Sequence, residues 1–582
     1  MRIKSGGIGM LKRILGTVKE YKSYAILTAI FVSIEVIMEV LIPVLMANMI
    51  DYGIEKSDMR VILKLGTALV TVAIISLIFG VLAGKFAAIS ACGFAKNLRK
   101  EVYDKVQEFS FVNIDKFKSS SLITRLTTDV SNIQQSFQMV IRVAVRAPML
   151  LIFSLFMAFN INKRVPFVFV FAILFLAVGM FFIMVKVRVP YEKAFKTYDK
   201  LNNIIQENVR SIKTVKSYVR EKFEDNKLGN VANELYNNFT RAEKIVVSVA
   251  PLMQFSMYMS ILLIAFIGSK LILSNNMTKG ELISLVSYTS QILISLMMVS
   301  GILVMVLISR ASLERVYEVL KEEIDLKNID NAKTDLKNGD IVFKDVSFGY
   351  FKSDNLCLKD INLHIKSGES VGIIGGTGSS KSTLVQLIPR LYDVSKGEIL
   401  VAGVNVVDYD ITTLRDNIAM VFQKNTLFSG TVKENLCMGN QNATDDEIKK
   451  ACEIACASSF IENMDDKYNS QVKQDGSNFS GGQKQRLCIA RALLKKPKIL
   501  ILDDSTSAVD TKTDAMIRNG LANSLPDTTK IIISQRIMSI SKLDKIIVMD
   551  NGTISAIGTH DELMKNSKLY KEIYMSQVKE DE

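Results

Sequence analysis

The side chains best suited to phosphate chemistry lie in a glycine-rich turn at residues 375–383, with the sequence GGTGSSKST. The strand-like run Ser370–Ile374 precedes this turn, and an apolar run, expected to be helical, follows it at residues 384–392. Strand, glycine-rich turn and helix in this order form a P-loop, whose backbone N–H groups bind phosphate oxygens. Lys381 is expected to contact the β- and γ-phosphates of ATP, and Ser382 to ligate Mg²⁺. The expected nucleotide-binding residues are Gly375, Gly376, Thr377, Gly378, Ser379, Ser380, Lys381, Ser382 and Thr383.

Ser380 occupies the position before the lysine, where the strict pattern has glycine. If the turn requires a positive φ at this position, a residue other than glycine costs roughly 1–2 kcal/mol. We therefore expect a tighter loop that still binds ATP.

A second stretch, Phe479–Asp510, combines a phosphate-binding turn with two carboxylates. The small residues after Phe479 open a helix that should stop near Lys496, because Pro497 disfavours helix at the residue before it. A helix start of this kind binds phosphate through its free N–H groups. The apolar run Ile499–Leu502 is typical of a buried parallel strand. Asp503 and Asp504 follow this strand, where α/β enzymes hold Mg²⁺.

Hydrophobic residues dominate the other half of the chain and require elements that cross a bilayer. The mean hydropathy of the 582 residues is +0.23, which is too apolar for an ordinary soluble enzyme. Apolar runs long enough to span a membrane concentrate in residues 1–310, whereas residues 340–582 have ordinary polarity. The predicted spans lie at residues 24–50, 61–84, 136–159, 165–186, 245–274 and 281–308. A mixed apolar and basic helix at residues 9–21 is expected to lie in the membrane interface.

The net charge of +13 follows the positive-inside rule. Lys and Arg cluster in two long connections, Lys85–Gln135 and Val187–Lys244, which places these connections and both termini in the cytoplasm. The sequence contains no basic patch interleaved with aromatic residues, so it gives no indication of nucleic-acid binding. The chain has six cysteines but only two histidines, so a Cys/His metal site is not expected. The cysteines are expected to be reduced thiols. The N-terminus has no pattern typical of a signal peptide.

Four ionisable residues fall within the predicted spans, where charges are costly and often functional. Glu35 and Glu39 share one helix face, and Arg142 and Arg146 share another. In one interpretation these residues pair with each other or contact a substrate. In the other, they line the water-filled side of the helix bundle or lie near an interface.

In their order and spacing, these motifs resemble those of a half-size ABC exporter. The resemblance implies an α-helical transmembrane domain, six spans with long cytoplasmic helical extensions, followed by an α/β P-loop ABC ATPase domain. The implied domains are an interfacial helix at 1–22, a transmembrane domain at 23–310, a connector at 311–340 and a nucleotide-binding domain at 341–582. Two short segments, Phe111–Lys118 and Ser211–Tyr218, would be the coupling helices that touch nucleotide-binding domains.

The resemblance also assigns roles to single residues. Tyr350 would stack on adenine, Gln423 would contact the Mg²⁺ region as the Q-loop residue, and Asp503 would be the Walker B ligand. The implied metal ligands are thus Ser382, Gln423 and Asp503. Residues that would face a partner's ATP are the signature residues Ser480, Gly481, Gly482 and Gln483 and the D-loop residue Asp510.

Two departures from the family pattern concern catalysis. Asp504 stands where active family members have a Glu that polarises the attacking water, and Gln535 replaces a His that contacts the γ-phosphate. An aspartate is one methylene shorter, and a glutamine can neither carry a positive charge nor shuttle a proton. Together they resemble the degenerate site of a subunit in heterodimeric bacterial multidrug-type exporters.

The resulting hypothesis is an exporter of drug-like, lipid or other amphipathic molecules in the plasma membrane, with ATP and Mg²⁺ as cofactors. Its partner would be a second half-transporter with an intact Walker B Glu and switch His. The alternatives are a slow homodimeric exporter and an ATP-gated regulator or channel. An importer is disfavoured, because importers usually keep membrane and ATPase parts on separate chains.

Overall fold

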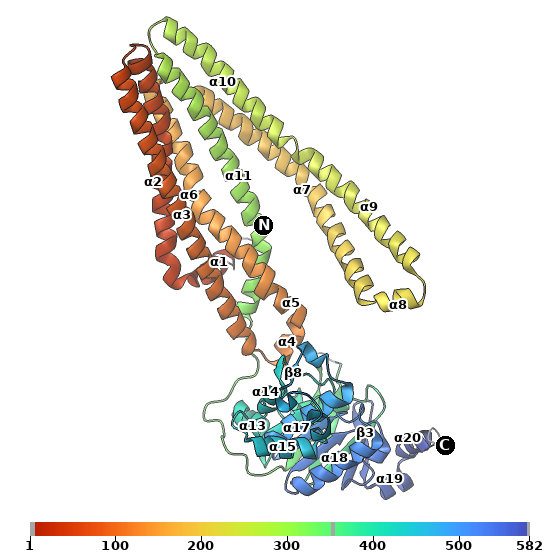
Figure 1. Cartoon of the computed structure of the whole chain (residues 1–582). Coiled ribbons are helices and arrows are strands. Elements are labelled where there is room, and N and C mark those ends of the chain that lie inside the picture. The colour runs from red at the N-terminus through yellow and green to blue at the C-terminus, as the bar shows by residue number, and fades with distance from the viewer. Residues whose placement is uncertain (1–5, 164, 351–354, 579–582) are drawn as a thin grey trace. The chain divides into compact units, whose positions relative to one another are not determined.

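The computed structural model describes residues 6–163, 165–350 and 355–578. The chain divides into two compact units. The first comprises Met1–Gln107 and Ser120–Lys321, and the second comprises Glu108–Ser119 and Glu322–Glu582. The first unit is helical, and the second is a mixed α/β domain (Figure 1).

Long helices build the first unit. They are α2 (Lys22–Asn48), α3 (Met59–Gln107), α6 (Val130–Ile161), α7 (Phe167–Arg210), α9 (Glu221–Val246), α10 (Val249–Leu273) and α11 (Lys279–Lys321). Within the described residues, six helical segments are long and apolar enough to cross a membrane, which confirms the six predicted spans. Helices α2, α3, α6 and α11 pack together, while α7 packs along α9 and α10 (Figure 1).

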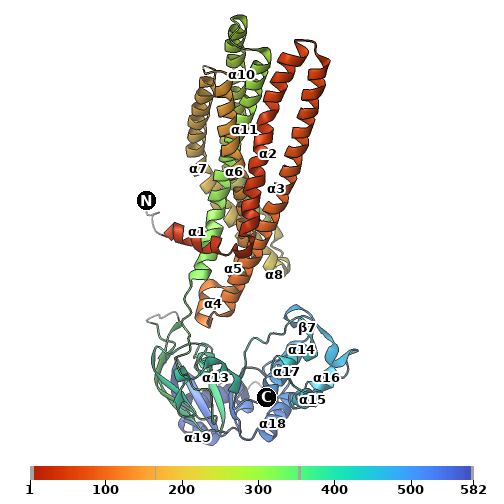
Figure 2. The ribbon, with the colours of Figure 1, turned by 90° about the vertical axis from the view of Figure 1, so that its left-hand side faces the viewer.

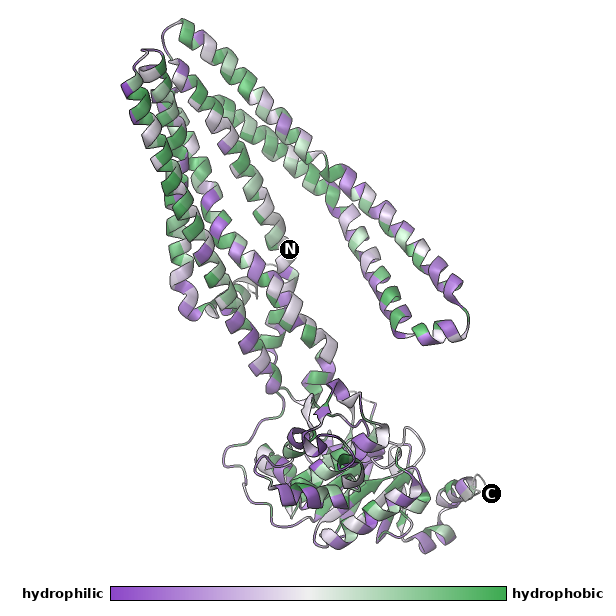
Figure 3. Ribbon diagram, in the orientation of Figure 1, coloured by the Kyte–Doolittle hydropathy of each residue, from purple (hydrophilic) through white to green (hydrophobic). Residues whose placement is uncertain are grey.

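The helices extend well beyond the length that a bilayer requires. Helix α3 has 49 residues, which corresponds to about 75 Å at 1.5 Å per residue, against a hydrocarbon core of about 30 Å. Figure 3 shows hydrophobic residues concentrated in one part of the long helices and hydrophilic residues toward α8 (Ile212–Ser217) and α9. The predicted helical extensions are therefore present.

Short helices occupy the positions that the sequence indicated. Helix α4 (Phe111–Phe117) begins with a capping box, in which Ser110 and Asn113 each bond the other's backbone N–H. Helix α8 is the second short element, and its side chains are largely exposed in the first unit. Helix α1 (Gly6–Gly16) lies across the long helices α2 and α11 rather than along them, as Figure 2 shows.

The ionisable residues of the spans pair with each other. Arg146 on α6 donates one hydrogen bond to Glu35 and another, of 2.8 Å, to Oε2 of Glu39, both on α2. Glu35 packs against Gly80 of α3, where a Cβ would stand 3.1 Å from the carboxylate. Among the described residues, no carboxylate pairs with Arg142. The predicted pairing among these residues is thus confirmed for Arg146, which bonds both Glu35 and Glu39.

Two main sheets form the second unit, the one expected to be the ATPase domain. The larger one has the order β12-β11-β3-β10-β9-β6, with β12 antiparallel to β11 and the other pairs parallel. Its strands are β3 (Ser370–Gly375), β6 (Ile418–Val421), β9 (Ile499–Asp503), β10 (Thr529–Ile533), β11 (Lys545–Asp550) and β12 (Thr553–Gly558). Strand β9 is buried along its whole length, as its apolar run predicted. A two-residue turn, Asn551-Gly552, joins β11 to β12.

The smaller sheet is antiparallel and has the order β2-β1-β4-β5. It contains β1 (Ile341–Phe348), β2 (Leu358–Ile365), β4 (Lys396–Val401) and β5 (Val404–Asn405), and a two-stranded sheet pairs β7 (Gly430–Thr431) with β8 (Gln471–Val472). The helices of the unit are α12 (Lys381–Gln386), α13 (Ile411–Asn417), α14 (Val432–Cys437), α15 (Asp445–Ile454), α16 (Ser458–Ile461), α17 (Gly481–Leu494), α18 (Thr511–Ser524), α19 (His560–Asn566) and α20 (Lys568–Val578).

One local prediction was wrong. The apolar run at 384–392 does not continue α12 as a regular helix, because α12 ends at Gln386 and Pro389 removes a backbone donor shortly after.

Candidate functional site

The glycine-rich turn connects β3 to α12, and its shape depends on three residues with positive φ. Gly375 has φ +157°, Gly378 has φ +84° and Ser380 has φ +69°. A side chain on Gly375 would collide with the carbonyl of Met549, so glycine is required there. Ser380 adopts the left-handed conformation that the sequence suggested, so it carries the expected backbone cost of roughly 1–2 kcal/mol.

Lys381 is held over this turn by the backbone. Its Nζ donates hydrogen bonds of 2.8 Å to the carbonyl oxygens of both Gly375 and Gly376. Burial lowers the pKa of Lys381, while the nearby charges of Asp504 and Asp503 raise it. The ammonium group therefore lies between the phosphate-binding turn and two carboxylates, where a phosphate oxygen could take over its hydrogen bonds.

Asp503 and Ser382 form a site whose oxygen donors suit Mg²⁺. Asp503 ends β9 with 2% of its surface exposed, and Ser382 Oγ donates a 2.9 Å hydrogen bond to its Oδ1. Burial raises the pKa of Asp503, which the Ser382 hydrogen bond partly offsets. Mg²⁺ prefers a few carboxylate and hydroxyl oxygens together with phosphate oxygens. The pair fits that role, in which the metal would neutralise phosphate charge.

Asp504 meets the other expected catalytic side chains at the same edge of the sheet. Gln535 Nε2 donates a 3.3 Å hydrogen bond to Asp504 Oδ2. Burial raises the pKa of Asp504, against the opposing effects of a Gln423 hydrogen bond and the charge of Lys381. Asp504 also has φ +48°. Gln535, Gln423 and Lys381 are far apart in the sequence, yet all three act on the Asp504 carboxylate.

Tyr350 lies at one end of this cavity and is linked to α4. Its hydroxyl is 3.0 Å from Thr383 Oγ1, and its ring meets the Tyr392 ring edge-on at 5.3 Å. The Tyr392 hydroxyl donates a 2.9 Å hydrogen bond to Asp115 of α4. Phe111 of α4 also stacks 6.5 Å from Phe422, the neighbour of the Q-loop residue. The first expected coupling helix therefore contacts Tyr392 and Phe422, which are neighbours of the cavity residues Tyr350 and Gln423.

The cavity that these residues enclose has a volume of about 570 Å³. Its lining includes the glycine-rich turn together with Tyr350, Gln423, Asp503, Asp504 and Gln535. Leu569 and Ile573 of α20 and Cys357 also line it, and no motif in the sequence had indicated them. Among the described lining residues, none comes from the signature turn.

The signature turn instead caps α17 at a separate surface. Ser480 Oγ accepts from the N–H of Gln483, and Gln483 Oε1 accepts from the N–H of Ser480 at 2.9 Å. A Cβ on Gly482 would approach the carbonyl of Ala508 to 2.8 Å, so the D-loop packs closely against this glycine. Asp510 caps α18 by accepting from Thr513 at 2.9 Å.

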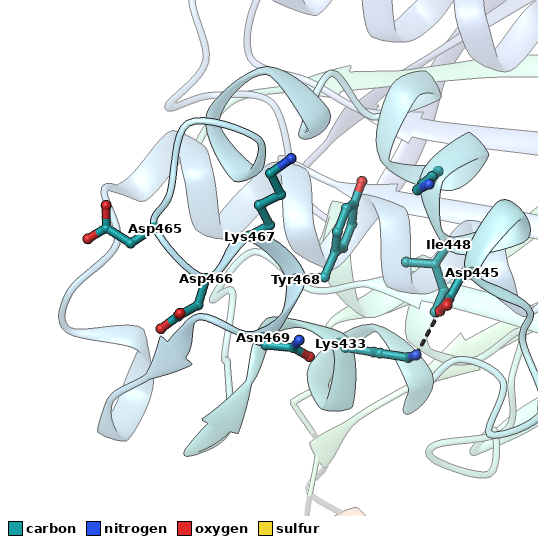
Figure 4. Close-up of a pocket in the computed structure, with 9 residues that line it drawn as sticks. Lys433, Asp445, Ile448, Asp465, Asp466, Lys467, Tyr468 and Asn469 are labelled. Carbon is teal, nitrogen blue, oxygen red and sulfur yellow. Dashed lines mark ion pairs between the residues drawn. The ribbon is translucent and has the colours of Figure 1, made fainter.

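A further pocket of about 400 Å³ lies in the helical part of the ATPase unit (Figure 4). Figure 4 shows its main ion pair, in which Lys433 Nζ lies 2.7 Å from Asp445 Oδ1. Lys467 pairs with Glu462 at 3.0 Å. Lys433 and Lys467 are paired with neighbouring carboxylates, and Lys449 also lines the pocket, which is therefore a charged surface.

Comparison with known proteins decides the family. Residues 25–297 match the family described as "ABC transporter transmembrane region", and residues 358–507 match the one described as "ABC transporter". The chain is 35% identical to the uncharacterized ABC transporter ATP-binding protein YfiB of Bacillus subtilis, over 97% of this chain and 98% of that protein. This chain belongs to the ABC transporter family.

This ABC transporter is also similar to the uncharacterized ABC transporter ATP-binding protein MT1311 of Mycobacterium tuberculosis, with 32% identity over 96% of this chain and 97% of that protein. Its fold matches the structure of a bacterial Atm1-family ABC exporter with ATP bound, with a TM-score of 0.80 and 20% identity. That match covers 97% of this chain and 98% of the exporter chain. The predicted fold class is confirmed: a helical membrane domain is followed by an ABC ATPase domain. The protein is a multi-pass membrane ATPase of the exporter type that couples ATP to transport.

Proposed function

We propose that this ABC transporter exports an amphipathic small molecule across the plasma membrane as one half of a heterodimer. Its own P-loop would form a slow, degenerate ATP site, and its signature turn would complete the fast site of a partner chain. The observation that carries this proposal is the Asp504–Gln535 pair beside Lys381, where family members with full activity place Glu and His.

The side chains at this site support slow hydrolysis. The aspartate carboxylate is one methylene too short to reach the position of a glutamate, and a displacement of about 1 Å can cost on the order of a hundredfold in rate. Gln535 can donate a hydrogen bond to a phosphate oxygen, but it cannot carry a proton. Nucleotide binding should persist, because Lys381 lies over the phosphate-binding turn and Ser382 hydrogen-bonds Asp503.

The signature turn, by contrast, retains what phosphate binding needs. Helix α17 has 14 residues, and Ser480 and Gly481 at its start are exposed. Free N–H groups at a helix start favour phosphate. A side chain at Gly482 would collide with the Ala508 carbonyl, so glycine is required at this position. A second chain's ATP could therefore bind here, completed by that chain's Glu and His.

Charge and relatives support the remaining parts of the proposal. The basic connections and the ATPase unit would lie in the cytoplasm by the positive-inside rule, with both termini. A similar protein of Staphylococcus aureus, provisionally named a multidrug export ATP-binding/permease protein, is 32% identical over 98% of this chain and 100% of that protein. This supports a drug-like, lipid or other amphipathic substrate.

The test is an asymmetry between two variants in the complex with a candidate partner, a half-transporter that has the Walker B Glu and the switch His. Ser480→Arg should abolish most MgATP hydrolysis, because it blocks the partner's fast site. Lys381→Ala should leave a substantial part, because it damages only the slow site. Ser477→Arg, at an exposed position outside the signature turn, is the matched control and should remain active.

Two outcomes would contradict the proposal. Equal losses from Ser480→Arg and Lys381→Ala would favour the slow homodimeric exporter, and robust hydrolysis by this chain alone would refute the division of labour between two chains. ATP-dependent ion conductance without substrate accumulation in vesicles would favour the gated channel.

A further inference from the structure

The last helix of the ATPase unit, α20, hydrogen-bonds the backbone of the switch residue Gln535. Helix α20 follows α19 at the C-terminal end of this unit (Figure 1). Leu569 and Ile573 of α20 line the nucleotide cavity, so the helix forms part of its wall. Tyr570 is fully buried, and its hydroxyl lies 2.8 Å from His560 Nδ1 of α19. This anchored helix is therefore a fixed support beside the site.

Gln577, one turn further along α20, bonds the backbone on both sides of Arg536. Its Nε2 donates a 2.6 Å hydrogen bond to the carbonyl oxygen of Gln535. Its Oε1 accepts a 2.8 Å hydrogen bond from the N–H of Ile537. One side-chain amide thus satisfies a backbone acceptor and a backbone donor that lie two residues apart.

These two bonds add to other constraints on the segment, since the Ile537 side chain is buried and Arg536 donates a 3.4 Å hydrogen bond to the carbonyl oxygen of Val509. Strand β10 ends at Ile533, and the 3-10 helix at Ile537–Ser539 begins after the switch residue. Ser534 Oγ accepts from the N–H of Arg536 at 3.0 Å, which shapes the turn from within. Gln577 supplies the side-chain hydrogen bonds to the Gln535 carbonyl and the Ile537 N–H, so without it the peptide after Gln535 could rotate and the Gln535 side chain would turn with it.

We infer that Gln577 is a positioning residue for the ATP site. Its two hydrogen bonds fix the backbone of residues 535–537, the switch segment, so that the Gln535 amide points at Asp504 and at the terminal phosphate. This inference rests on the proposed nucleotide site and adds to it a residue that acts through Gln535. The C-terminal helix thereby becomes part of the hydrolytic apparatus, although it contacts neither the P-loop lysine nor the Mg²⁺ ligands through Gln577.

The test compares Gln577→Leu and Gln577→Glu in the full-length chain, with Ser576→Ala as a matched control. Leucine removes both bonds, whereas glutamate retains an acceptor for Ile537 but loses the donor to Gln535. Ser576 is exposed and bonds only within α20, through the carbonyl of Ile573. Hydrogen exchange of peptides covering residues 534–540 reports the clamp directly. MgATP hydrolysis is measured for the complex with the partner chain in the Asp504→Glu background, with the partner's Walker B Glu changed to Gln so that only this chain's site turns over.

In Gln577→Leu, exchange at residues 535–540 should rise roughly tenfold, because two hydrogen bonds to the segment are lost. The kcat for MgATP should fall by a similar factor, while KM and the binding of a fluorescent ATP analogue change less than about twofold, because the phosphate-binding turn is untouched. Gln577→Glu should keep Ile537 protected and lose only part of kcat. Ser576→Ala should match the parent protein.

The inference is overturned if Gln577→Leu leaves both exchange at 535–540 and kcat unchanged. It is also overturned if exchange rises uniformly across the ATPase unit together with a lower Tm, since Gln577 would then only support the fold. A parent protein that binds no ATP analogue would instead refute the proposed nucleotide site, so the two failures are distinguishable.

Discussion

Replacing Asp504 with glutamate tests whether the short carboxylate limits hydrolysis at this chain's own ATP site. Asp504 Oδ2 lies 3.3 Å from Gln535 Nε2 at the end of β9, on the side that faces the glycine-rich turn. Glutamate extends the carboxylate by one methylene, which moves it by at least about 1 Å toward the phosphates. A positional gain of this size is worth on the order of a hundredfold in rate, equivalent to about 2.7 kcal/mol of activation free energy.

The same substitution should carry a cost in stability. Asp504 has φ +48°, a left-handed conformation that aspartate tolerates better than glutamate. The longer side chain should therefore destabilise the unit by on the order of 1 kcal/mol. A higher rate with a slightly lower Tm is the expected combination, and it separates a catalytic gain from a general stabilisation.

The assay is MgATP hydrolysis by the heterodimer in nanodiscs, with the partner's Walker B Glu changed to Gln so that only this site turns over. Asp504→Glu should accelerate the reaction between tenfold and a hundredfold, and Asp504→Asn, which removes the charge without changing length, should not. Equal rates for the two variants would refute the reasoning, since the carboxylate would then have no role. No acceleration by Asp504→Glu, together with a gain from Gln535→His, would place the limit at the switch residue instead.

Three other changes have expected outcomes. Ser380→Gly should stabilise the apo protein by less than about 1 kcal/mol, because relief of the left-handed strain exceeds the added entropy of the unfolded chain; an unchanged or lower Tm would contradict this. Because burial raises the pKa of Asp503, its charged form destabilises the fold above that pKa, so Asp503→Asn should raise Tm at pH 8. That gain should vanish as the pH falls through the pKa, and Mg²⁺-dependent ATP binding should be lost at every pH. Arg146→Met should destabilise the membrane unit by about 3–5 kcal/mol by leaving two carboxylates unpaired, whereas the control Arg142→Met should cost much less; adding Glu35→Gln to Arg146→Met should recover part of the loss.

Short-range patterns account for the parts of the fold that could be predicted. The glycine-rich turn, its strand and the positive φ at Ser380 depend on backbone geometry within a few residues. The six spans depend only on the length of apolar runs. The end of α12 was misjudged because hydrophobicity outweighed Pro389 in the prediction, although a proline so close to a helix end usually terminates it.

Contacts between distant segments escaped prediction because no short pattern encodes them. Arg146 could be placed on a helix face, but only packing of α6 against α2 brought it to Glu35 and Glu39. The link from Asp115 to Tyr392 spans 277 residues in sequence and requires α4 to pack against the rest of the ATPase unit.

The sequence alone determined which chemistry this transporter can perform, since Lys381, Asp503, Asp504 and Gln535 are identified by type and local spacing. Their chemical character belongs to each side chain and its immediate backbone, so it can be inferred without a structure. Only the tertiary structure determined the direction in which these side chains point. The bonds of Gln577 to the switch segment arise from α20, 42 residues away from Gln535, and such an orientation exists only once the helix has packed.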